Sequence, residues 1–227
     1  MSPSFSVSQD RTSIKRRILL VDDHPVVREG LAENINGQTD LMICAEADDR
    51  HAAMEAIKWA NPDLVIVDLA LKTSSGIELI KDIHSCWPRL AILVVSMHDA
   101  TLYAERALRA GAKGYLTKQE ATRSIIEAIR RVLNGEIYLN ERTATHMLGR
   151  LTSSPDSVTD PVVDVLAERE MQVFELTGHG LSTRQIAERL HIDVKTVETY
   201  RARIKEKLRL KDSNELLQLA IRWQKEI

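Results

Sequence analysis

Between Arg17 and Gly135 the sequence alternates between two hydrophobic patterns, and this alternation limits the possible folds more than any other feature. Short runs rich in Val and Ile predict five strands, at 17–22, 41–47, 63–69, 91–97 and 113–118. Segments with helical spacing predict helices at 25–35, 49–60, 76–87, 101–111 and 121–135. Repeated strand-then-helix units predict an α/β domain in which a parallel sheet has helices on both faces.

Charged and polar residues stand where these predicted strands end. They are Asp22 and Asp23 after the first strand, Asp68 after the third, Ser96 at the end of the fourth and Lys118 after the fifth. In an open parallel sheet, ligands bind outside the carboxyl ends of the strands, so we expect these side chains to converge. Each alone has an ordinary explanation as a cap, a turn residue or a solvated lysine. Their joint placement is what indicates a site.

The chemistry of this set indicates phosphate. Three clustered carboxylates repel one another unless a cation lies between them, and hard oxygen ligands suit Mg²⁺. Lys118 supplies a second positive charge and Ser96 a hydrogen-bond donor. Asp68 is then the predicted nucleophile, because a carboxylate can attack phosphorus to form an acyl phosphate.

The remainder of the chain has a different pattern. The weakly helical segment 136–151 is followed by TSSPDSVTDP, which predicts a flexible linker. Beyond it, helical patterns at 166–180, 182–190, 193–210 and 213–227 predict a small four-helix domain. The three-residue turn HID, with Ser182 and Asp193 as N-caps, predicts a helix-turn-helix. We therefore expect a disordered leader at 1–16, a phosphoacceptor domain at 17–135, a linker at 136–163 and a DNA-binding domain at 164–227.

The helix that begins near Asp193 has the features of one that enters a DNA groove. At 100° per residue, Val197, Ile204 and Leu208 share one face and predict its packed side. On the far side, Thr199 and Ala202 are small enough to let a helix lie deep in the major groove. Seven Lys or Arg against two Glu lie between positions 195 and 211, although the whole chain has a net charge of -2. We predict DNA contacts from Lys195, Thr196, Glu198, Thr199, Ala202, Arg203, Lys205 and Lys207.

Both halves resemble known families. The stretches LLVDDHPVVREGL, PDLVIVDLAL, GIELI, VVSMHD and YAERALRAGAKGYLTK are similar to the receiver domain of two-component response regulators. EREMQVFEL and GLSTRQIAERLHIDVKTVETYRARIKEKL are similar to the LuxR-type DNA-binding domain, with Ala167 in place of its usual capping Thr. Together they resemble a response regulator of the NarL/FixJ type. The resemblance implies a five-stranded, doubly wound, flavodoxin-like receiver followed by an all-α helix-turn-helix domain.

The resemblance also implies roles for individual residues. Asp68 matches the phosphoacceptor, Ser96 the switch hydroxyl, Lys118 the phosphate-binding lysine and Tyr115 the aromatic switch. Mg²⁺ would be held directly by Asp23 and Asp68, through water by Asp22, and by the backbone carbonyl of Ala70.

The implied partners are a histidine kinase, double-stranded DNA and a second copy of the chain after phosphorylation. The last helix, around Leu216 to Ile221, would be a dimer contact, although from the pattern alone it is equally an ordinary core-facing helix.

Composition limits the remaining classes. Cys44 and Cys86 have no metal-ligand spacing, no apolar run approaches the length of a membrane span, and no signal peptide is evident. We expect a cytoplasmic protein that is not an enzyme. One alternative is a phosphate-independent DNA-binding regulator whose receiver serves only for dimerisation. Another is an Mg-dependent phosphohydrolase, which is disfavoured because Ala70 stands where such enzymes often have a second Asp.

Overall fold

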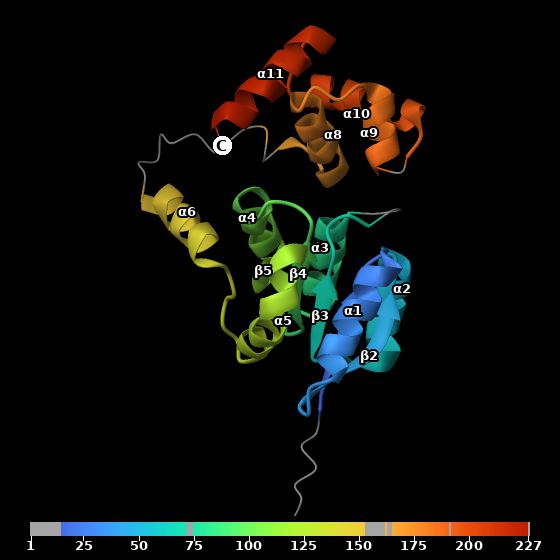
Figure 1. The fold of residues 1–227 in the computed structure, drawn as a ribbon, viewed down its shortest axis with the longest axis vertical. Helices are drawn as coiled ribbons and strands as arrows, with labels where there is room; N and C mark the ends of the chain where they lie inside the picture. Colours follow the sequence, from blue (N-terminus) through green and yellow to red (C-terminus); the bar gives the residue numbers. More distant parts are fainter. Residues whose placement is uncertain (1–14, 72–74, 153–161, 163–164, 191, 227) are drawn as a thin grey trace, which may run out of the picture.

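A computed structural model describes residues 15–71, 75–152, 162, 165–190 and 192–226. It contains an α/β domain and a smaller helical domain (Figure 1). Three parts of the chain lie outside the described residues: residues 1–14 of the expected leader, residues 72–74 in the loop after Asp68, where Lys72 and Thr73 lie, and most of the Pro- and Ser-rich stretch. Arg16, which the leader prediction included, is the first residue of a strand.

The five predicted strands form one parallel sheet. They are β1 (Arg16–Val21), β2 (Leu41–Ala47), β3 (Leu64–Val67), β4 (Ala91–Ser96) and β5 (Gly114–Thr117), in the order β2-β1-β3-β4-β5. All four residues of the central strand β3 are buried, which explains its uninterrupted apolar sequence. The predicted fold class is confirmed.

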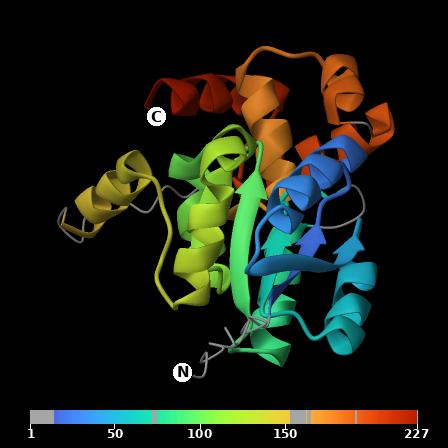
Figure 2. The same ribbon diagram turned by 60° about the horizontal axis from the view of Figure 1, so that its bottom comes forward.

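Five helices cover the sheet in two layers (Figures 1 and 2). One face packs against α1 (Pro25–Asn36) and α5 (Lys118–Leu133). The other packs against α2 (Arg50–Ala60), α3 (Gly76–Cys86) and α4 (Ala100–Ala110). Alternate residues of β1 serve the two layers, Leu19 and Val21 on one side and Ile18 and Leu20 on the other.

Part of the expected linker is structured. After α5 the chain turns back to the sheet edge, where Tyr138 N donates to Lys113 O and Tyr138 O accepts from Tyr115 N, both at 2.9 Å. The Tyr138 ring is buried with the residues of α5. Helix α6 (Glu141–Thr152) follows and packs against α4.

The helical domain consists of α8 (Glu168–Gly178), α9 (Thr183–Leu190), α10 (Val194–Lys207) and α11 (Ser213–Glu226). Its core includes Phe174, Ile186 and Trp223. The start of α8 has half of a capping box: Glu170 Oε2 accepts from Ala167 N at 2.8 Å, and alanine has no side-chain oxygen to accept from the Glu170 N–H in return. Asp193 occupies the predicted N-cap position of α10, but its side chain makes no capping hydrogen bond.

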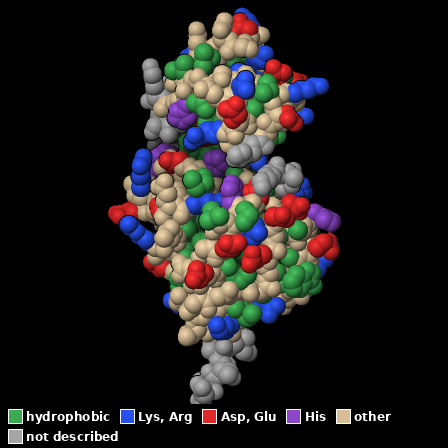
Figure 3. Space-filling view, turned by 45° about the vertical axis from the view of Figure 1, so that its right-hand side comes forward, with side chains coloured by type: hydrophobic (Ala, Val, Ile, Leu, Met, Phe, Trp, Pro, Cys, Tyr) green, Lys and Arg blue, Asp and Glu red, His purple; other side chains and the backbone are tan. Residues whose placement is uncertain are grey.

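The two domains share buried apolar contacts. The hydrophobic cluster formed by α2, α3 and α4 of the α/β domain continues into α8 and the neighbouring helices of the helical domain. In the space-filling view they meet at a waist near which several histidine side chains gather (Figure 3). Among the described helices, none combines the length and apolar character needed to cross a membrane.

Candidate functional site: an acidic cluster and a basic helix

The acidic residues predicted from the strand ends converge at one edge of the sheet. Asp22, Asp23 and Asp68 are 1%, 5% and 1% exposed. Because three carboxylates at this depth repel one another, the cluster requires positive charge nearby.

Lys118 supplies part of that charge. Its Nζ lies 2.7 Å from Asp22 Oδ2 and 2.7 Å from Asp68 Oδ2. Burial acts to lower the pKa of Lys118, but the neighbouring carboxylates of Asp68 and Asp22 outweigh it, so that the pKa stands above its ordinary value. The lysine is therefore a permanent cation that joins strand ends β1 and β3 to the start of α5.

Asp23 is paired with no lysine or arginine among the described residues. Its Oδ1 atom is buried and makes no hydrogen bond of good geometry there, and its nearest polar neighbour is His24 Nδ1 at 2.7 Å. A buried carboxylate oxygen in this condition is costly unless a cation satisfies it. The hard oxygens of Asp22, Asp23 and Asp68 fit Mg²⁺, and the imidazole of His24 is close enough to share an ion with them. The predicted carbonyl ligand, Ala70, lies beside them, with its N–H donating to Asp68 Oδ1 at 3.1 Å.

Ser96 and Tyr115 form a second group, connected through His98. Ser96 is fully buried, and its Oγ accepts from His98 N at 3.3 Å. Tyr115 is also buried, and its hydroxyl donates to His98 O at 3.1 Å. The two predicted switch residues therefore hold the same residue of the β4–α4 turn, which the sequence analysis did not single out.

His98 in turn reaches the helical domain. Its Nε2 lies 2.8 Å from Gln172 Nε2, and because the amide nitrogen can only donate, the imidazole nitrogen accepts. Burial lowers the pKa of His98 to about 4, consistent with a neutral ring. Beside it, Arg169 donates to Gln172 Oε1 at 2.9 Å and to Leu71 O, in the chain just after Asp68, at 2.6 Å.

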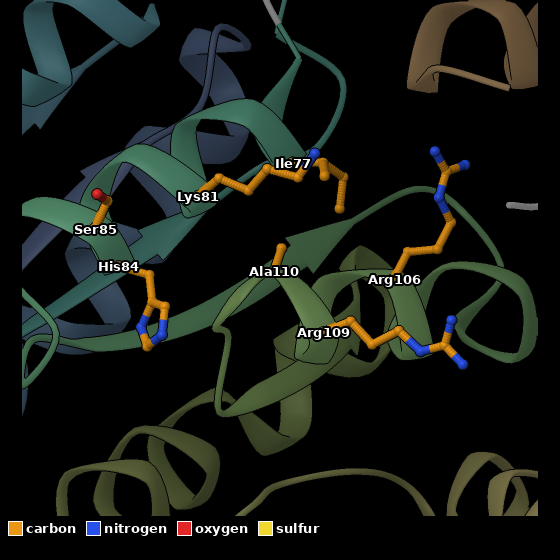
Figure 4. Close-up of a pocket in the computed structure, with 7 residues that line it drawn as sticks. All are labelled: Ile77, Lys81, His84, Ser85, Arg106, Arg109 and Ala110. Carbon is orange, nitrogen blue, oxygen red and sulfur yellow. The ribbon is translucent and has the colours of Figure 1, made fainter. Parts of the chain in front are cut away.

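Helix α4 makes two further polar contacts with the helical domain among the described residues. Arg106 Nη2 donates to Leu166 O at 2.6 Å, and Tyr103 is hydrogen-bonded to Glu175. Arg106 also borders a groove of about 580 Å³ between α3 and α4, where its guanidinium points away towards the helical domain (Figure 4). The other lining residues are Ile77, Lys81, His84, Ser85, Arg109 and Ala110, none of which was predicted as a site residue.

Helix α10 presents the predicted DNA-facing side to solvent. Val197 and Ile204 are fully buried, as the helical projection predicted, and Leu208 is partly buried. On the opposite side the exposed residues are Lys195, Glu198, Thr199, Ala202 and Arg203, with Thr196 and Lys205 partly exposed. Thr199 Oγ1 donates to Lys195 O within the helix at 2.9 Å.

Lys207 and α11 have structural contacts that the sequence did not reveal. Lys207 Nζ pairs with the buried carboxylate of Glu170 at 2.6 Å, which ties the end of α10 to α8.

In α11, Leu216 and Ala220 are buried in the domain core, whereas Leu217 and Ile221 are 37% and 38% exposed. Leu216 and Ala220 thus fit the core-facing interpretation of the last helix, and the dimer contact stays a prediction.

Comparisons with known proteins agree with both halves. Residues 18–130 match the response regulator receiver domain, and residues 164–220 match the luxR family of bacterial regulatory proteins. The transcriptional regulatory protein YxjL of Bacillus subtilis (strain 168), itself described as uncharacterized, is 34% identical over 92% of this chain and 96% of its own length. The oxygen regulatory protein NreC of Staphylococcus haemolyticus (strain JCSC1435) is 33% identical over 91% of this chain and 97% of its own.

Solved structures give the same fold. A LuxR-family two-component response regulator from Aurantimonas sp. SI85-9A1 has a TM-score of 0.57 and 34% identity, over 60% of this chain and 98% of that chain. RcsB of Salmonella enterica serovar Typhimurium, solved bound to a promoter, has a TM-score of 0.57 and 22% identity over 91% of this chain and 98% of that chain. The chain belongs to the two-component response regulators that join a receiver domain to a LuxR-type helix-turn-helix domain, and it is a DNA-binding transcription regulator.

Proposed function

We propose that Asp68 accepts a phosphoryl group from a partner histidine kinase, and that this modification controls DNA binding by the helical domain. The observation that carries the proposal is the position of Lys118 Nζ, 2.7 Å from both Asp68 and Asp22 inside a buried carboxylate cluster. A cation fixed at this distance can stabilise the negative oxygens of an incoming phosphoryl group.

The proposed transfer forms one bond and breaks another. A carboxylate oxygen of Asp68 attacks phosphorus, and the bond from phosphorus to the donor histidine nitrogen breaks with return of the electron pair to that nitrogen. When bound by Asp22, Asp23 and Asp68, Mg²⁺ would supply charge neutralisation for the phosphoryl oxygens. The unsatisfied Asp23 Oδ1 supports such binding, and so does the oxygen-rich donor set.

The signal would leave the receiver through His98. Ser96 and Tyr115 both hydrogen-bond the backbone of His98, and the His98 ring contacts Gln172 on α8. A phosphoryl group that recruits the Ser96 hydroxyl would therefore change the contact that docks the helical domain. Phosphorylation can control the helical domain only if the docked and released arrangements differ in their contacts with phosphorylated Asp68. The hydrogen bonds that join Ser96 and Tyr115 to His98, and His98 to Gln172, would supply such a difference.

In this arrangement the DNA-facing side of α10 is already exposed. The proposed control is thus a change in how two copies are oriented, rather than the uncovering of a buried helix. A homodimer formed through the exposed Leu217 and Ile221 of α11 would place two α10 helices on one duplex. We place this action in the cytoplasm, where promoter DNA is accessible.

Two alternatives make different predictions. A receiver used only for dimerisation would have no need of the Lys118–Asp68 pair or of the unsatisfied Asp23 oxygen. A phosphohydrolase would need a second acid or base near Asp68, and the residue two positions on is Ala70. We therefore infer that the phosphoryl group is a signal and not a step in turnover.

The test is labelling of the purified protein with acetyl phosphate and Mg²⁺. We expect one base-labile phosphoryl group in the wild type, none in Asp68→Asn, and tighter DNA binding by the labelled wild type only. Asp63→Asn is the matched control, because Asp63 precedes the same strand but pairs with Arg16 at the opposite end. Undiminished labelling of Asp68→Asn, or DNA binding that ignores the label, would contradict the proposal.

A further inference from the structure

The imidazole of His24 lies among the three carboxylates of the acidic cluster. Its Nδ1 atom is 2.7 Å from Asp23 Oδ1, 3.1 Å from Asp22 Oδ1 and 3.9 Å from Asp68 Oδ2. The Asp23 oxygen nearest to it is the one that makes no hydrogen bond of good geometry among the described residues. The candidate metal site therefore includes a nitrogen atom, His24 Nδ1, beside its carboxylate oxygens.

The backbone explains why the ring is directed towards the cluster. His24 precedes Pro25, and a residue before proline is restricted to extended conformations, as its φ of -98° and ψ of 104° show. Its backbone N–H donates to Asp22 Oδ1 at 2.8 Å, while its side chain makes no capping hydrogen bond to α1. The side chain is 50% exposed, so it can adjust without repacking the core.

The distances match those between ligands of a single ion. Atoms bonded to one octahedral cation at about 2.1 Å lie about 3.0 Å apart when adjacent and about 4.2 Å apart when opposite. The separations from Nδ1 to the three carboxylate oxygens, 2.7, 3.1 and 3.9 Å, each lie within about 0.3 Å of one of these values. All four candidate donor atoms lie within 4.8 Å of one another, which is wider than the distance between opposite ligands, so binding one ion requires them to draw together.

We propose that His24 binds a late first-row divalent metal, such as Co²⁺, Ni²⁺ or Zn²⁺, directly through Nδ1 alongside the aspartates. Imidazole suits these ions, whereas Mg²⁺ prefers oxygen and retains water in the remaining positions. His24 thus sets the metal preference of the site: it strengthens the binding of imidazole-favouring ions and leaves Mg²⁺ almost unaffected. The inference rests on the proposed function, because it assumes that the acidic cluster binds a divalent cation.

The experiment compares Ni²⁺ and Mg²⁺ binding by calorimetry in the full chain. For His24→Ala we expect the Ni²⁺ affinity to fall by roughly 10–100-fold and the Mg²⁺ affinity to change by less than about twofold. His146→Ala, which removes an exposed histidine on α6, should change neither. Asp23→Ala should weaken both ions, and thermal melts of every variant check folding.

Each outcome decides one point. The proposal is overturned if the ratio of Ni²⁺ to Mg²⁺ affinity in His24→Ala stays within threefold of the wild-type ratio. In that case the ring only donates a hydrogen bond to Asp22, which would support the binding of both ions alike. If the wild type binds neither ion, or if Asp23→Ala binds both normally, the cation site of the proposed function is wrong as well. Loss of Ni²⁺ alone in His24→Ala supports the inference.

Discussion

The hydroxyl of Tyr103 on α4 donates a hydrogen bond to Oε1 of Glu175 on α8, 3.1 Å away across the boundary between the two domains. Burial raises the pKa of Glu175 to about 7. The negative charge of Asp99 also acts to raise this pKa, whereas the hydrogen bond from Tyr103 and the positive charge of Arg106 act to lower it. The boundary thus contains a carboxyl group that titrates near neutral pH.

The first prediction follows from the sign of that shift. Because the folded-state pKa of Glu175 lies above its ordinary value of 4.5, its contribution to stability is complete below pH 4.5 and is lost as the pH rises through about 7. Glu175→Gln removes the charge and keeps an acceptor for Tyr103. We expect the variant to be more stable than the wild type at pH 8, on the order of 1–3 kcal/mol, and the two to converge near pH 4.5.

Thermal melts across this pH range are the measurement, with Glu188→Gln on the exposed face of α9 as control. His98, whose pKa is lowered to about 4, contributes the opposite pH dependence to both proteins and cancels in the difference. Equal stability of Glu175→Gln and wild type at pH 8 would show that this carboxyl group is not buried in solution.

The second prediction concerns Gln172. Its amide contacts the His98 ring on the receiver and accepts from Arg169, also on α8, which in turn donates to Leu71 O. Gln172→Ala therefore removes one direct link between α8 and the receiver and the support of a second. We expect the unphosphorylated variant to bind DNA more like the phosphorylated wild type, which reduces the effect of phosphorylation by roughly 2–10-fold. Binding curves with and without acetyl phosphate measure it. Arg130→Ala, which breaks an ion pair with Asp40 elsewhere on the receiver, should leave the effect unchanged.

The third prediction tests the face of α10. Ala202 is exposed opposite the buried Val197 and Ile204, so Ala202→Glu places a carboxylate where the groove should be. We expect operator binding to weaken at least tenfold with little change in melting temperature, because phosphates repel the new charge. Gln218→Glu adds the same charge on α11 and should have a smaller effect. Normal operator binding by Ala202→Glu would exclude this face from the groove.

The fourth prediction separates two lysines of α10. Lys205→Ala should lower the salt slope of DNA binding by about one unit without affecting stability. Lys207→Ala should in addition lower the free energy of unfolding by about 1–3 kcal/mol, because Glu170, 3% exposed, would lose its ion-pair partner. Binding at two salt concentrations and thermal melts provide both readings. Identical melts for the two variants would show that the Lys207–Glu170 pair is unimportant.

The fold and the acidic cluster could be predicted because each depends on local pattern. Alternating strand and helix periods identify parallel strands, and parallel strands end at the same edge, so Asp22, Asp68 and Lys118 had to meet. The roles predicted for individual site residues remain predictions. Helical projection likewise separated the buried Val197 and Ile204 from the exposed side of α10.

Contacts between the domains could not be predicted in this way. His98 and Gln172 are 74 positions apart, and Tyr103 and Glu175 are 72 apart, with no shared period to relate them. Projection also gives the direction of a side chain and not its partner, so the pairing of Lys207 with Glu170 went unnoticed. His24 was missed for another reason: its neighbours Asp22 and Asp23 explained the motif without it.

The return of the chain to β5 has a consequence for self-association. A strand at the rim of a sheet offers unpaired backbone groups to any other strand, and proteins that leave such a rim open risk aggregation. Tyr138 occupies these positions beside β5 through its hydrogen bonds with Lys113 and Tyr115. A second receiver therefore cannot extend the sheet at this edge, which leaves β2, at the opposite edge of the described sheet, as the place where a strand could be added.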